Sequence, residues 1–181
     1  MNTLEAIRNR RSIRKFKDQK VDHSVIEDII ADAAFAPSWK NTQCARYHIT
    51  ENREIMEKIA NEYTLGFAYN TGTIAKAPQL VVLTAIRGRS GMEKDGSATT
   101  DKGESWLMFD AGIAAQTFCL AAAERGVGSV IMGIFDADKV AELLNIPENE
   151  TVVCLIPIGY PDETPVAPRR KAVRELVTFC E

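Results

Sequence analysis

A short stretch near the start of the chain carries the residues best suited to binding an anion. In NRRSIRKFK, residues 9–17, arginine and lysine side chains surround a single serine. Side chains alternate between two faces in an extended segment, which would put Arg10, Ser12 and Arg14 on the same face. Two guanidiniums beside a hydroxyl suit a phosphate, because arginine offers forked charged donors and serine a short neutral one. Taken alone, such a run is more often a solvated surface than a site.

The charge balance of the whole chain narrows the class of anion. The 181 residues hold 22 basic and 25 acidic side chains, a net charge of -3, and the sequence pI is about 5.5. A nucleic-acid-binding domain usually has a basic surplus over a whole face. Here the surplus is confined to the first stretch and to a second cluster, RRKAVR at 169–174. Two local basic patches favour a small anion and argue against nucleic acid as a partner.

Motifs for side-chain catalysis are missing from the sequence. It contains no GxxxxGK, HExxH or GxSxG pattern, and neither His23 nor His48 stands in a hydrolytic motif. The glycines of GVGSVIMG, residues 126–133, follow a predicted helix, whereas a dinucleotide fingerprint follows a strand and opens a helix. We therefore name no catalytic residue, and if the protein is an enzyme we expect a cofactor to supply the chemistry.

The cysteines do not form a metal-binding or disulfide pattern. They stand at positions 44, 119, 154 and 180, far apart and without a CxxC pair. We expect them to be reduced and mostly buried, and we predict no metal site. The N-terminus has no apolar signal-peptide core, which favours a cytoplasmic setting.

Helices alternate with short strands along the chain, which predicts a single α+β domain over residues 1–181 with four or five strands. Thr3 is a plausible N-cap of a first helix, and Ser24 with Glu27 has capping-box spacing before an amphipathic run that Pro37 stops. Asn52 and Asp136 are candidate caps of two later helices, and Gly126 is a candidate helix end.

Strands are predicted over residues 47–50, 78–85 and 151–161, with a further short strand after Gly126; the strand at 78–85 is buried because its apolar run is continuous. Residues 87–103 are polar and glycine-rich, as in a lid or a disordered loop. Residues 106–123 are apolar all round and long enough to approach a membrane span. Asp110, Gln116 and the many alanines favour a helix buried in protein instead, in the core or at a dimer interface, with Trp106, Phe109, Ile113 and Phe118 at helical spacing.

Four separated segments, in order along the chain, together resemble one family, the nitroreductase-like FMN oxidoreductases. RRSIRKF at 10–16 is similar to the family's N-terminal phosphate and ribityl motif, and APSWKNTQ at 36–43 to its APS..N.Q segment. DAGIAAQTFCLAAAERGVGSVIMGIFD at 110–136 resembles its long central helix and the strand after it. IPIGYPDETPVAPRRKAVREL at 156–176 resembles its closing GYP...P..R signature.

The resemblance implies an antiparallel-rich sheet surrounded by helices, in an intertwined homodimer that holds two FMN molecules at its subunit interface. It implies that Arg10, Ser12 and Arg14, with Arg11 as a further candidate, bind the phosphate and the polar edge of the flavin. Arg170, with Arg169 as a second candidate, would close on the phosphate. The remaining implied roles belong to residues near the flavin ring: Pro37, Ser38 and Asn41 from the partner subunit, and Met132 and Gly133, where a backbone N–H could reach flavin N5.

The implied activity is a ping-pong reaction in which NADH or NADPH reduces the flavin and a nitroaromatic, a quinone or another flavin takes the two electrons. Other relatives fragment the flavin or remove halogen from an aromatic, and a flavin-storage protein without turnover is a further alternative. Trp39 and Lys40 replace residues that are usually small in the family, so the acceptor pocket is the least defined part. Trp39 could stack on the flavin or on a bound aromatic, or only pack at the interface. The sequence decides neither the acceptor nor the nicotinamide.

Overall fold

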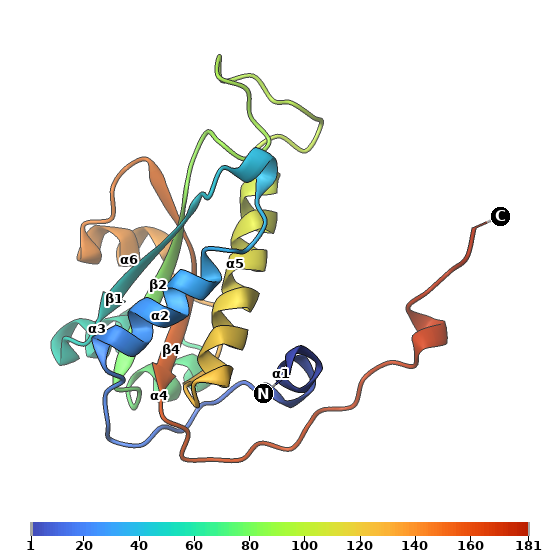
Figure 1. Cartoon of the computed structure of the whole chain (residues 1–181). Coiled ribbons are helices and arrows are strands. Elements are labelled where there is room, and N and C mark those ends of the chain that lie inside the picture. The colour runs from blue at the N-terminus through green and yellow to red at the C-terminus, as the bar shows by residue number, and fades with distance from the viewer. Residues whose placement is uncertain (1, 181) are drawn as a thin grey trace.

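A four-stranded antiparallel sheet organises the chain in a computed structural model that describes residues 2–180 (Figure 1). Its strands are β1 (Ala45–Thr50), β2 (Gln79–Ile86), β3 (Gly128–Ser129) and β4 (Glu150–Gly159). They lie in the order β1-β2-β4-β3, and every neighbouring pair is antiparallel. The predicted α+β fold with an antiparallel-rich sheet is confirmed.

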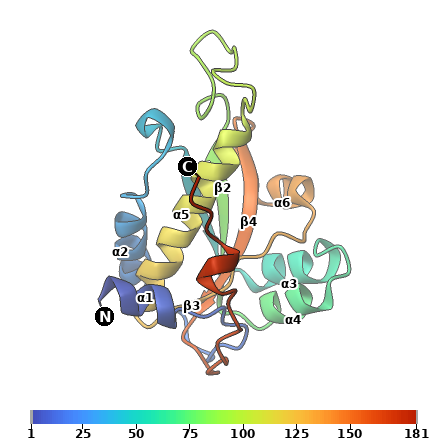
Figure 2. The same cartoon turned by 90° about the vertical axis from the view of Figure 1, so that its right-hand side faces the viewer.

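Six α-helices cover the sheet within the described residues. They are α1 (Thr3–Asn9), α2 (His23–Ala33), α3 (Arg53–Glu62), α4 (Ala68–Ile74), α5 (Ser105–Glu124) and α6 (Ala137–Leu144), with 3-10 turns η1 (Trp39–Asn41) and η2 (Val173–Glu175). Figure 2 shows α2 and α5 on one side of the sheet and α3, α4 and α6 on the other. Helix α4 has no counterpart among the predicted elements.

The central strand β2 is buried on both faces, which explains its continuous apolar run. Val81 and Leu83 point into the core formed with α2 and α5, while Leu80 and Val82 point into the core on the side of α3, α4 and α6. All four side chains are fully buried. Alternate side chains of a strand leave opposite faces, so a strand between two helical layers needs apolar residues at every position.

Several predicted helix boundaries are confirmed by hydrogen bonds at the caps. Asn52 Oδ1 accepts from the backbone N–H of Glu54 at 2.9 Å, and Asp136 Oδ1 accepts from the N–H of Lys139 at 3.1 Å. Gly126 follows the end of α5 with φ of +72°, the left-handed conformation that glycine adopts without a steric cost.

Two cap predictions are wrong. Helix α1 is capped by Asn2 and not by Thr3, because Asn2 and Glu5 form a reciprocal capping box at 3.0 and 2.9 Å. Helix α2 begins at His23 after Asp22, so Ser24 lies inside its first turn and the Ser24 capping box does not form. Both errors come from placing a helix start one or two residues late, where several polar residues compete for the cap.

Helix α5 is the one helix of the described chain whose length and composition would allow it to cross a membrane. Half of its apolar window is buried within the protein, and it packs against α2 and the sheet. Phe118 is fully buried in the core, whereas Phe109 is 59% exposed. The helix therefore packs as a core helix that leaves one apolar face uncovered in the single chain.

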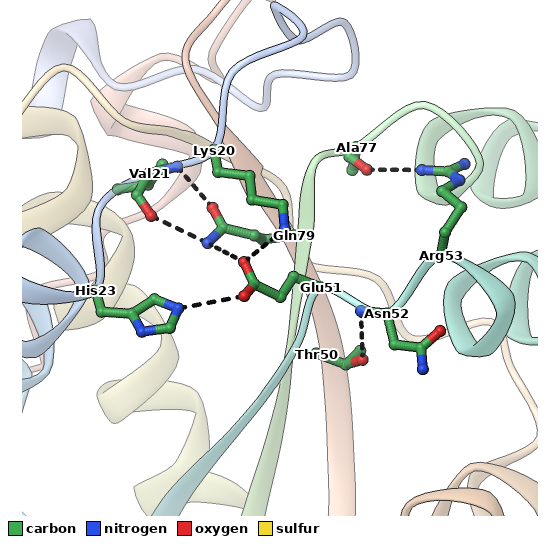
Figure 3. Close-up of polar contacts among 9 residues, drawn as sticks. All are labelled: Lys20, Val21, His23, Thr50, Glu51, Asn52, Arg53, Ala77 and Gln79. Atoms are coloured by element: carbon green, nitrogen blue, oxygen red, sulfur yellow. Dashed lines mark hydrogen bonds and ion pairs between the residues drawn. The ribbon is translucent and has the colours of Figure 1, made fainter.

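A buried glutamine fixes the extended segment between the basic stretch and α2 (Figure 3). The amide of Gln79 accepts from the backbone N–H of Val21 at 2.8 Å and donates to the carbonyl of Val21 at 3.0 Å. Its amide nitrogen also lies 3.4 Å from the carboxylate of Glu51, which forms ion pairs with Lys20 at 3.2 Å and His23 at 3.5 Å. Strand β2 thus sets the path by which the N-terminal segment crosses the end of the sheet.

A polar row across β1, β2 and β4 should make stability depend on pH. His48 Nε2 lies 2.7 Å from the carboxylate of Glu150, which also accepts a hydrogen bond from Thr84. Burial alone would raise the pKa of Glu150, but the hydrogen bonds from Thr84 and His48 and the charge of Arg46 outweigh it. The pKa of Glu150 is therefore held below its ordinary value of 4.5.

A carboxylate with a lowered pKa stabilises the fold above its unfolded-state pKa, and this contribution is lost as pH falls through the folded-state pKa. We expect the free energy of unfolding of the unmodified protein to fall more steeply between about pH 5 and pH 3 than that of Glu150→Gln. Urea titrations across this range measure the difference. Glu148→Gln, at an exposed position two residues away, serves as control and should follow the unmodified protein. Parallel curves for all three proteins would contradict the prediction.

The segment after β4 leaves the body of the protein as an extended arm (Figure 1). We call residues 164–180 the C-terminal arm. Its large apolar side chains are exposed, and they are Val166, Val173, Leu176, Val177 and Phe179. So much exposed apolar surface on the C-terminal arm indicates that the arm packs against another molecule.

Candidate functional site: a basic cavity joined to an aromatic one

The basic stretch lies against β3 as an irregular extended segment. The N–H of Ile13 donates to the carbonyl of Ser129 at 3.0 Å, and the side chain of Ile13 is buried. A Cβ on Gly128 would come within 2.9 Å of Ile13, so glycine is needed there for the segment to approach the sheet. The short side chain at position 128 thus lets the arginines on either side of Ile13 sit close to the body.

The residues that follow β4 hold the basic stretch from its other side. The N–H of Lys17 donates to the carbonyl of Tyr160 at 2.9 Å. The carboxylate of Glu163 accepts from the backbone N–H groups of Arg14 and Lys15, at 2.6 and 3.1 Å. A carboxylate that accepts two backbone N–H bonds fixes the direction of the chain at Arg14.

Both ends of the chain meet at a cavity of about 300 Å³, here called the basic cavity. Its lining residues are Arg10, Arg11, Ser12, Arg14, Pro165, Val166, Pro168 and Arg170. Four guanidinium groups and one hydroxyl lie in this lining, which contains no carboxylate. Such a donor set selects an anion with several oxygen acceptors, such as a phosphate.

The arginines of the two basic patches are not equivalent. Arg11 Nη1 donates to the carbonyls of Arg8 and Arg10 at 2.6 and 2.8 Å, so part of its donor capacity serves the end of α1. Arg170 and Arg14 also line the cavity, and in the described chain each makes only one longer bond of this kind, from Nη1 to the carbonyl of Pro168 at 3.2 Å and of Ser12 at 3.4 Å. Arg169 is exposed and lies outside this lining. Arg10, Arg14 and Arg170 are thus the charged side chains best placed to bind an anion.

A second cavity of about 410 Å³, here called the aromatic cavity, adjoins the first one through Arg14. Its lining residues are Arg14, Phe67, Tyr69, Asn70, Val130, Ile131, Met132, Gly133 and Ile134. The N–H of Met132 is bonded to the carbonyl of Leu155 at 2.8 Å. Gly133 is exposed beside it, and nothing lies within 4 Å of the place of its missing Cβ. The backbone at Gly133 is therefore open to close approach by a flat ligand.

Three residues of the aromatic cavity were not singled out by the sequence. The rings of Phe67 and Tyr69 lie 5.7 Å apart at the start of α4, and both are exposed. Asn70 is buried, and its side chain donates to the carbonyl of Ile134 at 3.0 Å. The available signal was the dense aromatic and polar run GFAYN at 66–70, which has no helical periodicity. This run becomes informative only because α4 lies beside the segment after β3 that carries Met132 and Ile134.

The remaining predicted residues lie elsewhere in the same chain. Pro37 and Ser38 line a separate cavity of about 320 Å³ between α2, β1 and α5, and Asn41 ends the neighbouring turn η1. Ser38 Oγ accepts from the N–H of Gln43 at 2.9 Å. The single chain therefore does not bring Pro37, Ser38 and Asn41 to the basic cavity.

The buried thiols near the site are poor nucleophiles. Burial raises the pKa of Cys119 against the opposing effects of Ser129 and Arg10, and it raises the pKa of Cys154 to about 12. Cys44 is buried as well, and Cys180 is exposed, so the prediction of mostly buried, unpaired cysteines is confirmed. A thiol must ionise to attack a substrate or bind a metal, and burial opposes this.

Comparison with known proteins identifies the family of the chain. The model of the nitroreductase family matches residues 7–67 and 65–160. The chain is 31% identical to the NADPH-flavin oxidoreductase of Vibrio harveyi, over 94% of this chain and 71% of that protein. Nitroreductase A of Vibrio parahaemolyticus has the same fold, with a TM-score of 0.84, 28% identity, and coverage of 100% of this chain and 77% of that one.

A more distant likeness comes from iodotyrosine deiodinase bound to FMN and 3-iodo-L-tyrosine. It gives a TM-score of 0.80 at 21% identity and covers 97% of this chain and 99% of that one, which shows a shared fold. The family model spans most of the chain, including the basic stretch, the central helix and the sheet. The protein therefore belongs to the nitroreductase family.

Proposed function

We propose that this protein is an FMN-dependent NAD(P)H oxidoreductase that binds the FMN phosphate in the basic cavity. The observation that carries the proposal is the lining of that cavity. Arg10, Ser12 and Arg14 come from the N-terminal part of the chain and Arg170 from the C-terminal part, and the lining contains no carboxylate. A phosphate monoester near neutral pH is close to dianionic and accepts several charged hydrogen bonds. The relative from Vibrio harveyi, named an NADPH-flavin oxidoreductase, supports the same assignment.

The aromatic cavity would hold the flavin ring. Because Arg14 lines both cavities, one ligand with a phosphate at one end and a flat ring at the other can occupy them together. Gly133 would offer its backbone N–H to the ring edge, with Met132 packed beneath it. Phe67 and Tyr69 would form a wall against which a nicotinamide or an aromatic acceptor can stack. Arg11 and Arg169 would add positive charge around the phosphate.

FMN held by Arg10, Ser12, Arg14 and Arg170 would supply two-electron redox chemistry between NADH or NADPH and a second substrate. The residues of this chain bind and orient the flavin, bring both substrates to the same face in turn, and keep positive charge beside the ring. No side-chain acid or base is required. We expect nitroaromatics, quinones or flavins as acceptors, and a cytoplasmic setting.

We propose further that the protein works as a homodimer in which Pro37, Ser38 and Asn41 of one protomer complete the flavin site of its partner. Uncovered apolar surface supports this proposal. Met108 and Phe109 on α5 are 50% and 59% exposed, and a shallow groove runs beside them along the helix. The apolar C-terminal arm also lacks a covering surface in the single chain. Obligate dimer interfaces bury large apolar areas of this kind.

The test is an anaerobic visible absorbance spectrum of the FMN-loaded protein before and after NADH or NADPH, followed by a nitroaromatic or a quinone. Bleaching by a nicotinamide and recovery of the yellow colour on addition of the acceptor are expected. A protein that stays yellow with both nicotinamides would favour flavin storage. Bleaching reversed only by 3-iodo-L-tyrosine would favour the dehalogenating alternative, and failure to bind FMN would contradict the proposal.

Glu163 offers a test of how the phosphate site is held. In Glu163→Ala the N–H groups of Arg14 and Lys15 lose their acceptor, so the basic stretch should loosen and the Kd for FMN should rise about threefold to tenfold. Glu163→Gln removes the charge but keeps an acceptor oxygen, and it should bind FMN at least as well as the unmodified protein. Flavin fluorescence on titration gives both constants. An equal rise of the Kd for FMN in the two variants would show that the negative charge of Glu163, and not its contact with the backbone, determines the affinity for FMN.

A further inference from the structure

A buried carboxylate on α5 has no part in the proposed chemistry. Asp110 is 4% exposed, and its Oδ2 accepts two hydrogen bonds, from the backbone N–H of Trp39 at 2.8 Å and from Ser90 Oγ at 2.6 Å. Both donors are neutral groups. A buried carboxylate is costly to desolvate, and an apolar side chain of similar size often stabilises a fold as well or better. This residue therefore calls for an explanation other than stability.

The contacts of Asp110 join three segments that are far apart in the sequence. They are α5 itself, the turn η1, and the loop at residues 87–104 that rises beyond the end of α5 (Figure 2). Ser90 is fully buried and also pairs with Thr42 Oγ1 at 3.1 Å, and Lys40 forms an exposed ion pair with Glu93 at 3.0 Å. The polar loop is thus tied to η1 by a buried hydrogen-bonded centre and an exposed ion pair, an arrangement unlike a free lid.

The backbone of η1 has a conformation that needs such support. Lys40, Asn41 and Gln43 have φ values of 44°, 56° and 47°, which residues with a side chain rarely adopt. The hydrogen bond to Asp110 is made at Trp39, immediately before this strained run. Releasing that bond would allow the turn to relax and the Trp39 ring to move.

The ring of Trp39 is part of an aromatic row at the N-terminal end of α5. Its centroid lies 5.1 Å from that of Trp106 at an interplanar angle of 41°, and Trp106 meets Phe109 edge to face at 5.4 Å. Trp106 Nε1 donates to Thr100 Oγ1 of the same loop at 3.0 Å. The position of Trp39 therefore depends on both the loop and α5.

We propose that Asp110 is a positioning residue for the electron-acceptor site. It holds the backbone of Trp39 directly and the 87–104 loop through Ser90. These contacts set the position of the Trp39 ring, which in turn decides which acceptors fit. The inference rests on the proposed function, in which residues 37–41 of one protomer complete the flavin site of the other. Trp39 stands in the middle of that segment. Asp110 acts through Trp39 and the loop.

The test compares Asp110→Ala with Asp110→Asn in the FMN-loaded protein. The amide oxygen of asparagine can accept the same two hydrogen bonds, because both converge on one oxygen of Asp110. The chain has only two tryptophans, Trp39 and Trp106, so their close pair should give an exciton couplet in the far-ultraviolet circular dichroism spectrum. The couplet reports the position of Trp39 without any turnover.

In Asp110→Ala we expect the couplet to lose about half its amplitude or more. The KM for a large quinone or nitroaromatic should change about threefold or more relative to that for a small one, while FMN content and the rate of bleaching by NAD(P)H stay near the unmodified values. Asp110→Asn should restore both the couplet and the KM ratio. A role in stability alone would lower the melting temperature without changing the KM ratio.

An Asp110→Ala protein with an unchanged couplet and an unchanged KM ratio would overturn the inference. If that variant does not fold, Ser90→Ala replaces it in the test, because it removes the hydrogen bond that ties the loop to Asp110. An unchanged couplet and an unchanged KM ratio in Ser90→Ala would also overturn the inference. The proposed function fails in a different way. If NAD(P)H does not bleach the flavin of the unmodified protein, the protein is not the proposed oxidoreductase, and Asp110 has no acceptor site to position. The two failures are distinguished by the behaviour of the unmodified protein.

Discussion

Replacing Arg10 or Arg170 by alanine is expected to strip most of the FMN from the protein while leaving the fold intact. Each variant removes a charged hydrogen bond to phosphate, worth about 1.5 to 3 kcal/mol. The Kd for FMN should therefore rise about tenfold to 150-fold. Both side chains line the basic cavity, although they come from opposite ends of the chain. The measurements are the ratio of flavin to protein absorbance after purification and a fluorescence titration of apo-protein with FMN.

Arg169→Ala is the matched control for Arg170→Ala, because the two arginines are neighbours and only Arg170 lines the cavity. We expect the control to change the Kd for FMN by less than about threefold, because Arg169 lies outside the cavity lining and its exposed charge acts on the phosphate only through solvent, where salt screens it. Circular dichroism should show all three variants folded. Full flavin occupancy in both Arg10→Ala and Arg170→Ala would exclude the basic cavity as the phosphate site.

The second large effect is expected from the C-terminal arm. Leu176 and Phe179 are 69% and 89% exposed in the single chain. Covering such a side chain contributes about 1.5 to 3 kcal/mol. If the arm packs on the partner subunit, the double variant Leu176→Asp with Phe179→Asp should raise the Kd of the dimer by at least about 10² to 10⁴, the effect of one arm, and both arms of the dimer carry the change. Sedimentation at several protein concentrations measures the dimer, and oxidoreductase activity at the same concentrations should fall with it.

Thr178→Asp controls for the added charge, because it places an aspartate in the same exposed segment without removing a large apolar side chain. We expect this variant to remain dimeric and active. Dissociation of the control to the same extent as the double variant would attribute the effect to charge alone. A double variant that stays dimeric at low concentration would mean that the arm is not part of the interface.

Many features with local causes were predicted from the sequence, although the caps of α1 and α2 were placed one or two residues late. The apolar run of β2, the caps at Asn52 and Asp136 and the helix end at Gly126 depend on neighbouring residues or on burial on both faces of a strand, and these were predicted correctly. Helix α4 was missed because its sequence AYNTGTI lacks helical periodicity. Tertiary packing against α3 holds it, and packing routinely overrides weak local preference.

The candidate site also has features that the sequence predicts and features that only the structure shows. The sequence by itself determined the α+β class, the family resemblance and the residue types suited to a phosphate, because these depend on composition, periodicity and motifs in order along the chain. Only the tertiary structure decided that Phe67 and Tyr69 line one cavity with Met132 and that Asp110 holds Trp39. Each of these contacts joins segments that are far apart in sequence, and such contacts form only when the whole core packs, which no local pattern encodes.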